Sequence, residues 1–237
     1  MLKYPLIVPY MSFLNTILDT IFPVRCVLCG KSGADLCQNC LQRTPAAERE
    51  SAEWIFPICD YRSPGIKKSL WLLKYNGKKR LARVFAEVLY GKIIEELSEL
   101  SIMENFADPI LIPIPLSPQR RRERGFNQTE LICRELIKIH MERCSHGNNQ
   151  AKKINLWLED KILLKPRETE HQARIRDRRE RLKNIVGSFT VQNEEKIKGK
   201  NIILIDDILT TGATLSEARK VLRRAGARKI IAFTIAH

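Results

Sequence analysis

Two acidic residues and a threonine-rich turn follow an apolar run in the stretch IILIDDILTTGAT, at residues 202–214. A buried parallel strand would carry the two carboxylates to its carboxyl end, where ligands bind in open α/β sheets. Such a pair accepts hydrogen bonds from neighbouring hydroxyls, as on a ribose ring, or holds Mg²⁺ through water. The helix that starts after them can enclose a phosphate with its backbone N–H groups and positive dipole end. We therefore expect one site for a diol and a phosphate, formed by Asp206, Asp207, Thr210, Thr211, Gly212, Ala213 and Thr214.

Four cysteines near the N-terminus form two Cys-x-x-Cys pairs. Four sulfur ligands at this spacing predict a structural zinc site, with a redox dithiol or an iron site as the alternatives. The complete set of four leaves no open coordination position, so we expect a structural role. Close pairs within an odd total of seven cysteines favour a reducing compartment, and we expect a cytoplasmic protein. The expected metal ligands are Cys26, Cys29, Cys37 and Cys40.

The composition predicts a globular chain with an anionic partner. Its 237 residues are 44% hydrophobic, which suits one α/β core with a small appendage. A formal charge of +14 favours binding to phosphates, nucleotides, nucleic acid or an anionic membrane surface. The apolar N-terminal segment is interrupted by prolines and polar residues, so we expect no membrane span. Apolar residues at helical spacing over 13–22 predict a short amphipathic helix that packs on the protein itself, with docking to a membrane or partner as the alternative.

Alternating strand and helix patterns must position these residues. Nearly all-apolar strands separated by helices predict an α/β fold with a parallel sheet covered on both faces. We expect a first domain at residues 1–45, a polar connector, and a main domain at 54–237. The stretch RCSHGNNQAKK, at 143–153, reads as an exposed insertion. The predicted strands lie at 54–61, 109–115, 186–191, 201–207 and 229–237, and the predicted helices at 64–75, 81–97, 125–139 and 214–224.

The stretch at 202–214 resembles the 5-phosphoribosyl 1-diphosphate (PRPP) motif of the type I phosphoribosyltransferases. That motif has a hydrophobic strand, two acids, two variable residues and a Thr-Thr-Gly-x-Thr-like loop, and every position matches here. The stretches IPIPLSPQRRRERGFNQTELI and KPRETEHQARIRDRRERLKNIVGSF, with the cysteine pairs, resemble the ComF-type family of competence and amidophosphoribosyltransferase-like proteins. The similarity covers nearly the whole chain. It implies a Rossmann-like phosphoribosyltransferase domain with an N-terminal four-cysteine zinc knuckle.

The resemblance also implies roles for single residues. The 5-phosphate of PRPP, bound with Mg²⁺, would lie on residues 210–214, and its ribose on Asp206 and Asp207 as catalytic residues. Its pyrophosphate would lie along Pro115, Leu116 and Ser117, near Arg124. The family's hallmark is Arg124, Gly125, Phe126, Asn127 and Gln128, and its mobile loop matches Arg167, Thr169, Gln172 and Asn184, with Arg178, Arg179 or Arg181 at the family's arginine position.

Two classes of function fit these residues. The first is an enzyme that transfers a phosphoribosyl group to a nitrogen nucleophile. The second is a non-catalytic competence factor that binds single-stranded DNA and uses the fold as a scaffold or a PRPP sensor. The basic runs at 120–124 and 174–183 could neutralise pyrophosphate, contact a nucleic-acid backbone, or simply be solvated helix faces. The competence association implies a competence helicase as a further partner, and no residue identifies the acceptor.

Overall fold

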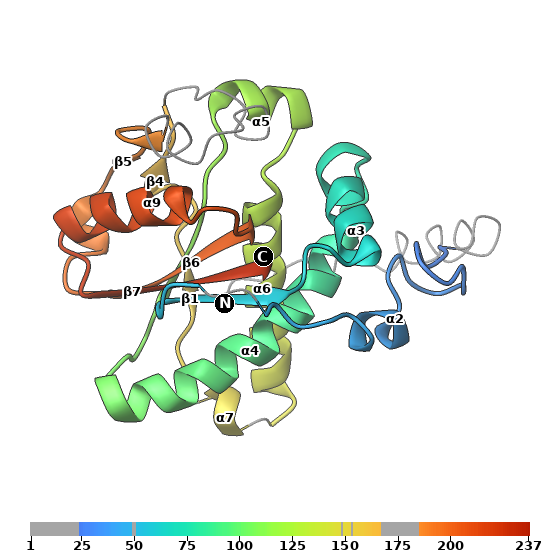
Figure 1. The fold of residues 1–237 in the computed structure, drawn as a ribbon. Coiled ribbons are helices and arrows are strands. Elements are labelled where there is room, and N and C mark those ends of the chain that lie inside the picture. The colour runs from blue at the N-terminus through green and yellow to red at the C-terminus, as the bar shows by residue number, and fades with distance from the viewer. Residues whose placement is uncertain (1–23, 49–50, 148, 153, 167–184) are drawn as a thin grey trace, which may run out of the picture. The chain divides into compact units, whose positions relative to one another are not determined.

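The computed structural model describes residues 24–48, 51–147, 149–152, 154–166 and 185–237 (Figure 1). The chain divides into two compact units, Met1–Arg43 and Thr44–His237. The helix expected over 13–22 and the expected mobile loop from Arg167 to Asn184, with its basic run, lie outside the described residues.

The first unit is a loop that folds back on itself and ends in a short helix. Arg25 forms an antiparallel bridge with Ser32. Gly33 has a φ of 111°, a backbone conformation that favours glycine, and its N–H donates to the carbonyl of Val24 over 2.8 Å. Helix α2, Gln38–Gln42, begins directly after Cys37. This return of the chain brings the two cysteine pairs together.

The second unit is built on a five-stranded sheet in which all neighbouring strands are parallel. The carboxyl ends of the strands therefore share one edge of the sheet, as the apolar strand patterns predict. From one side to the other, the strands are β1 (Ile55–Cys59), β7 (Lys229–Ala236), β6 (Asn201–Ile208), β2 (Ile110–Pro113) and β3 (Trp157–Leu158).

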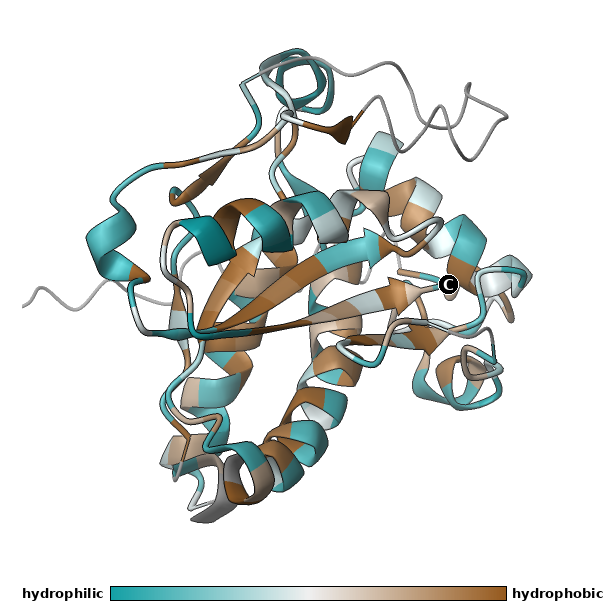
Figure 2. Cartoon of the chain, turned by 60° about the vertical axis from the view of Figure 1, so that its left-hand side comes forward, coloured by the Kyte–Doolittle hydropathy of each residue, from teal (hydrophilic) through white to brown (hydrophobic). Residues whose placement is uncertain are grey.

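Helices cover both faces of this sheet, as expected. Helix α4 (Leu81–Glu104) and helix α6 (Gln128–Ser145) pack together on one face, and α9 (Ala213–Arg224) packs on the other (Figure 1). Helix α3 (Pro64–Tyr75) packs against α4. Figure 2 shows the apolar strands enclosed between these helices.

The central strand β6 is buried on both faces, and its residues alternate between them. Leu204 belongs to the core cluster that includes Leu215, Ala218 and Leu222 of α9. Ile203 is equally buried but lies outside that cluster, so it faces α4 and α6. Even-numbered residues of β6 therefore point toward α9, and odd-numbered residues point away from it.

Shorter elements lie between the main ones. Of the described helices, none is both long and apolar enough to span a bilayer. Strands β4 (Leu163–Leu164) and β5 (Thr190–Val191) form a separate antiparallel pair, and the other elements are α5 (Pro118–Arg124), α7 (Asn149–Lys152) and the 3-10 helix η1 (Glu194–Lys196).

Most described residues of the stretch at 143–153 are exposed, as predicted. Helix α6 nevertheless extends into it as far as Ser145, and Ala151 is buried. Shortly after it, β3 adds the fifth strand of the main sheet beside β2. The sequence did not reveal α7 or β3, because a one-turn helix and a two-residue strand leave no detectable hydrophobic period.

Candidate functional site

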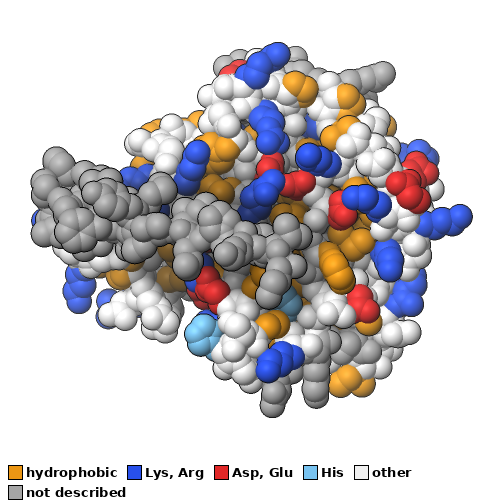
Figure 3. Space-filling view, turned by 180° about the vertical axis from the view of Figure 1, so that it is seen from behind, with side chains coloured by type: hydrophobic (Ala, Val, Ile, Leu, Met, Phe, Trp, Pro, Cys, Tyr) orange, Lys and Arg blue, Asp and Glu red, His pale blue; other side chains and the backbone are white. Residues whose placement is uncertain are grey.

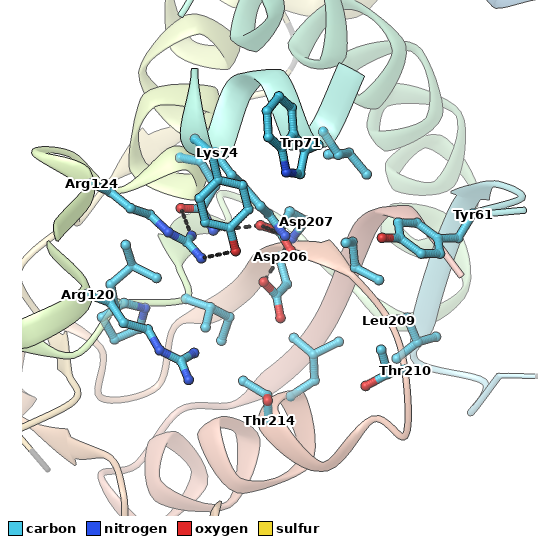
Figure 4. A pocket seen from close by; sticks show the side chains of 18 of the residues that line it. Tyr61, Trp71, Lys74, Arg120, Arg124, Asp206, Asp207, Leu209, Thr210 and Thr214 are labelled. Atoms are coloured by element: carbon cyan, nitrogen blue, oxygen red, sulfur yellow. Dashed lines mark hydrogen bonds and ion pairs between the residues drawn. The ribbon is translucent and has the colours of Figure 1, made fainter. Parts of the chain in front are cut away.

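A cavity of about 730 Å³ opens at the carboxyl edge of the parallel sheet in the second unit (Figure 4). It is lined by the segments that follow β1, β2 and β6, by helix α3 and by the start of α9. The structure brings most of the expected site residues to this one cavity, namely Pro115, Leu116, Ser117, Arg124, Asp206, Asp207, Thr210, Gly212, Ala213 and Thr214.

The threonine-rich loop turns the chain from β6 into α9. Gly212 has a φ of 75° and precedes the first helical residue, Ala213. The first-turn N–H groups of a helix have no carbonyl partner inside the helix, so this start can bind an anion. Thr210 and Thr214 lie at the cavity in Figure 4. Thr211 differs from the expectation, because it lines a neighbouring small pocket and its hydroxyl accepts a hydrogen bond from the N–H of Ala213 over 3.4 Å.

The two carboxylates at the end of β6 have different surroundings. The Asp207 carboxylate accepts a hydrogen bond from Nε2 of Gln128 over 2.6 Å and pairs with Nζ of Lys74 over 2.8 Å. Asp206, on the face toward α9, accepts a hydrogen bond from the N–H of Asp207 over 2.8 Å. In Figure 4 the Asp206 carboxylate points into the open part of the cavity. Asp206 is therefore the carboxylate placed to meet a ligand, whereas Asp207 is held by α3 and α6.

Burial and the adjacent Asp207 carboxylate raise the pKa of Asp206 to about 7. Both causes disfavour the charged carboxylate, and Lys74 and Lys165 offset them only in part. A cation or a set of hydroxyl donors would stabilise the ionised form of this group. The donor set thus fits a hard cation such as Mg²⁺, which prefers carboxylate oxygen.

The loop after β2 is held in place by the start of α6. Asn127 and Thr129 donate hydrogen bonds from their side chains to the carbonyl of Ile114, over 3.1 and 2.7 Å. Ser117 is buried, and its hydroxyl accepts a hydrogen bond from the N–H of Arg120 over 3.4 Å, which caps α5. These contacts give the hallmark residue Asn127 a structural role, because it positions the loop expected to contact pyrophosphate.

Basic side chains outnumber acidic ones around the cavity. Of the described residues that line it, six are Lys or Arg and two are Asp. The arginine run could be predicted from the sequence, whereas the contributions of α3 and of Lys165 to the cavity could not. For α3, the signal in the sequence was the spacing of Trp71 and Tyr75, which places two aromatic side chains on the same face of the predicted helix. The lining cations are Lys67, Lys68, Lys74, Arg120, Arg124 and Lys165.

The four N-terminal cysteines form one metal-binding group in the first unit. Their sulfur atoms all lie within 4.8 Å of one another, and the sulfurs of Cys29 and Cys37 are 3.6 Å apart. Tetrahedral Zn–S bonds of about 2.3 Å place sulfurs about 3.8 Å apart, so the group fits zinc. Hydrogen bonding with the Cys37 sulfur raises the pKa of Cys40 to about 12. Without a cation the four sulfurs could not all be thiolates near neutral pH, and the donor set therefore suits a structural zinc site.

The parallel sheet, the acid pair at its carboxyl edge and the helix-start loop define a phosphoribosyltransferase-like α/β protein. The phosphoribosyl transferase domain family matches residues 165–237, and the double zinc ribbon domain family matches residues 17–51. A solved hypoxanthine phosphoribosyltransferase of Trypanosoma cruzi is a distant likeness, with 12% identity, 66% coverage of each chain and a TM-score of 0.35.

Curated relatives cover most of the chain. The DNA utilization protein YhgH of Salmonella typhimurium is 26% identical over 208 residues, which are 86% of this chain and 80% of that protein. Competence protein F of Haemophilus influenzae is 27% identical over 85% of this chain and 81% of its own. Competence protein ComFC of Streptococcus pneumoniae is 32% identical over 68% of this chain and 59% of its own. The chain belongs to the ComF-type family of the phosphoribosyltransferase superfamily.

Proposed function

We propose that this protein binds Mg²⁺-PRPP in the cavity and transfers its phosphoribosyl group to a nitrogen nucleophile. The observation that carries the proposal is the convergence on one cavity of Asp206, four of the five residues of the helix-start loop at 210–214, and six basic side chains. The 5-phosphate would bind the start of α9, and the ribose hydroxyls would donate to Asp206. The pyrophosphate would lie along Pro115 to Ser117, near Arg120 and Arg124.

The transfer would proceed with these residues as binding and charge-neutralising groups. The bond between C1 of the ribose and the pyrophosphate oxygen breaks, and the electron pair leaves with pyrophosphate. The nucleophile's nitrogen forms a bond to C1 and loses its proton to water. Arginine and lysine side chains at the pyrophosphate stabilise the developing charge, which is the main catalytic contribution expected of this site. Bound Mg²⁺ would add charge neutralisation at the phosphate oxygens.

Calorimetric titration of the zinc-loaded protein with Mg²⁺-PRPP at several pH values tests this proposal. Ribose hydroxyls and Mg²⁺ both need the ionised form of Asp206, whose pKa is about 7. We expect the affinity to rise about tenfold from about pH 6 to about pH 8. The raised pKa of Asp206 also predicts that the unliganded protein becomes less stable as the pH rises from about 4 to about 7. In this range the folded chain keeps a proton that the unfolded chain has released.

The Asp206→Asn variant is the control for this pH series. The phosphates of PRPP titrate in the same range in both proteins, so only the difference between their pH profiles reports on Asp206. Absence of heat with the wild-type protein at every pH would refute PRPP binding. If the pH profile of the wild-type protein is parallel to that of the variant, Asp206 does not take part in PRPP binding.

Single-stranded DNA binding is a second candidate, favoured by relatives named for competence and DNA utilization. On the face shown in Figure 3, Lys and Arg are interspersed with Asp and Glu. Among the described residues, Arg83 pairs with Glu142 over 2.6 Å. On α5, Arg122 is exposed and Arg121 pairs with Glu130 over 2.9 Å, while Arg120 turns to the cavity. The exposed arginines of α5 are thus the basic residues that we propose for a DNA backbone, and a helicase partner stays a prediction.

Replacing Arg121 and Arg122 by Ala should weaken binding of a labelled oligo-dT and flatten its salt dependence. Loss of two phosphate contacts would lower the slope of log K against log salt by about 1.4, because each contact to a single strand contributes about 0.7. Fluorescence anisotropy at increasing NaCl measures the slope. A matched double variant, Arg83→Ala with Arg143→Ala, removes two arginines that pair with Glu142 and Glu87, neither of which contacts α5, and should leave the slope unchanged. Equal slopes for both variants would exclude α5 as the DNA contact.

A further inference from the structure

Gln128, the first residue of α6, lies between a cation and a carboxylate of the cavity. It is buried, and so is Asp207. Oε1 of Gln128 accepts a hydrogen bond from Nη1 of Arg124 over 2.9 Å, and its Nε2 donates to Asp207 over 2.6 Å (Figure 4). A guanidinium has only donors and an ionised carboxylate has only acceptors, so the two charges hold the amide in one orientation. The amide group of Gln128 thus stands between Arg124 and Asp207.

The guanidinium of Arg124 makes its other contacts with neutral groups. Nη2 donates to the Tyr75 hydroxyl over 3.2 Å, and the guanidinium lies 5.0 Å from the centre of the Tyr75 ring. Within the described part of the chain, no carboxylate pairs with Arg124, whereas Arg121 of the same helix pairs with Glu130 over 2.9 Å. The positive charge of Arg124 is therefore not cancelled by an acid, and it can bind an anion in the cavity that Arg124 lines.

Local preferences do not explain why the residue at position 128 is neutral. Glu and Gln have similar helix propensities. An acid in the first turn of a helix is stabilised by the positive end of the helix dipole, and α6 already carries one there, Glu130. The reason for a neutral side chain therefore lies in its tertiary surroundings, where a carboxylate would pair with Arg124 and repel Asp207.

We infer that Gln128 is a positioning residue that keeps Arg124 and Asp207 from pairing with each other, so that Arg124 keeps its charge for the pyrophosphate of PRPP. The inference rests on the proposed function, which puts pyrophosphate near Arg124. A side chain of this length fills the space between the guanidinium and the carboxylate, and its neutral amide binds each group without cancelling its charge. Asp207 meanwhile keeps its ion pair with Lys74.

Calorimetric titration with Mg²⁺-pyrophosphate and, in parallel, with Mg²⁺-PRPP tests this inference. The carboxylate of Gln128→Glu would pair with Arg124, and we expect both affinities to fall about tenfold or more. Gln128→Met keeps the length without adding a charge, so the loss should be about threefold at most. Gln119→Glu is the matched control, because it makes the same change of charge at an exposed position of α5 that does not line the cavity. Its effect should stay below about twofold.

A double variant separates this role from a merely structural one. Arg124→Ala should weaken Mg²⁺-pyrophosphate binding by itself. Adding Gln128→Glu should then weaken it by less than about twofold more, because the charge that the new carboxylate would cancel is already gone. Should Gln128→Glu not fold, Gln128→Ser takes its place, since a short side chain lets Arg124 approach Asp207. Additive losses, or equal losses in Gln128→Met and Gln128→Glu, would overturn the inference.

Failure of this inference is distinguishable from failure of the proposed function. Ribose 5-phosphate lacks the pyrophosphate and should bind the wild-type protein and the variants alike, so a loss that includes ribose 5-phosphate would contradict the role of Gln128. If wild-type protein and Gln128→Glu bind Mg²⁺-PRPP equally well, that role is refuted while the PRPP site stands. If wild-type protein gives no heat with either pyrophosphate or PRPP, the proposed function fails and the inference fails with it.

Discussion

Replacing Asp206 and Asp207 together by Asn is expected to weaken Mg²⁺-PRPP binding by at least about a hundredfold. A hydrogen bond to a charged group contributes about 1.5 to 3 kcal/mol, and the double variant removes the charge from both carboxylates. Asp206 loses its charge-assisted bonds to the ribose hydroxyls. Asp207 loses the ion pair with Lys74 that holds α3 at the cavity. Calorimetric titration measures the affinity, and release of pyrophosphate reports any turnover.

A second acid pair in the same sheet provides the control. Glu159 and Asp160 follow strand β3, as Asp206 and Asp207 lie at the end of β6. They pair with Lys196 and Arg134 instead of lining the cavity. Glu159→Gln with Asp160→Asn should therefore leave PRPP affinity unchanged. If both double variants bind PRPP like the wild-type protein, the ligand does not use the carboxyl end of β6.

The single variants separate binding from folding. Asp206→Asn removes a carboxylate whose raised pKa shows that its charged form is disfavoured, so the fold should be slightly more stable near neutral pH. Asp207→Asn leaves the Lys74 ammonium, whose side chain is 13% exposed, without its charged partner and should destabilise the fold. Thermal unfolding measures both effects. A loss of PRPP binding in Asp206→Asn with unchanged or higher stability would assign the effect to the site itself.

Removal of zinc is expected to unfold the first unit while the second unit stays folded. In the described part of the first unit, one buried leucine, Leu36, accompanies the cysteines, and α2 has no buried residue. Structural zinc contributes about 10 to 16 kcal/mol in small peptide domains, which far exceeds what so small a core supplies. The second unit contains the parallel sheet and its own core. Zinc content, together with limited proteolysis over residues 24–43, measures the effect.

Single cysteine variants make this test specific. Cys37→Ser removes one of the four clustered sulfurs and should lower zinc content from about one ion per chain toward zero. Cys144→Ser changes a cysteine of the second unit that lies outside the cluster and should keep the metal. Protease resistance of residues 24–43 after complete removal of zinc would show that the metal does not hold this unit together.

The sequence by itself determined the parts of this protein whose chemistry is local. The strand, acid pair and helix start at 202–214 are contiguous, and the structure places them at the carboxyl edge of a parallel sheet. The cysteine pairs are equally local, because a short loop between two Cys-x-x-Cys turns leaves few ways to arrange four sulfurs.

Only the tertiary structure decided how the two acids differ and what faces them. Because side chains alternate along a strand, the sequence already indicates that Asp206 and Asp207 point to opposite faces of the sheet. The partners of Asp207, however, come from α3 and α6, which are far away in the sequence. The aromatic side chains of Trp71 and Tyr75 became part of the cavity because α3 packs beside the sheet edge. Such contacts depend on which helices cover which face and at what angle, and the hydrophobic periodicity of a single segment carries no information about that choice.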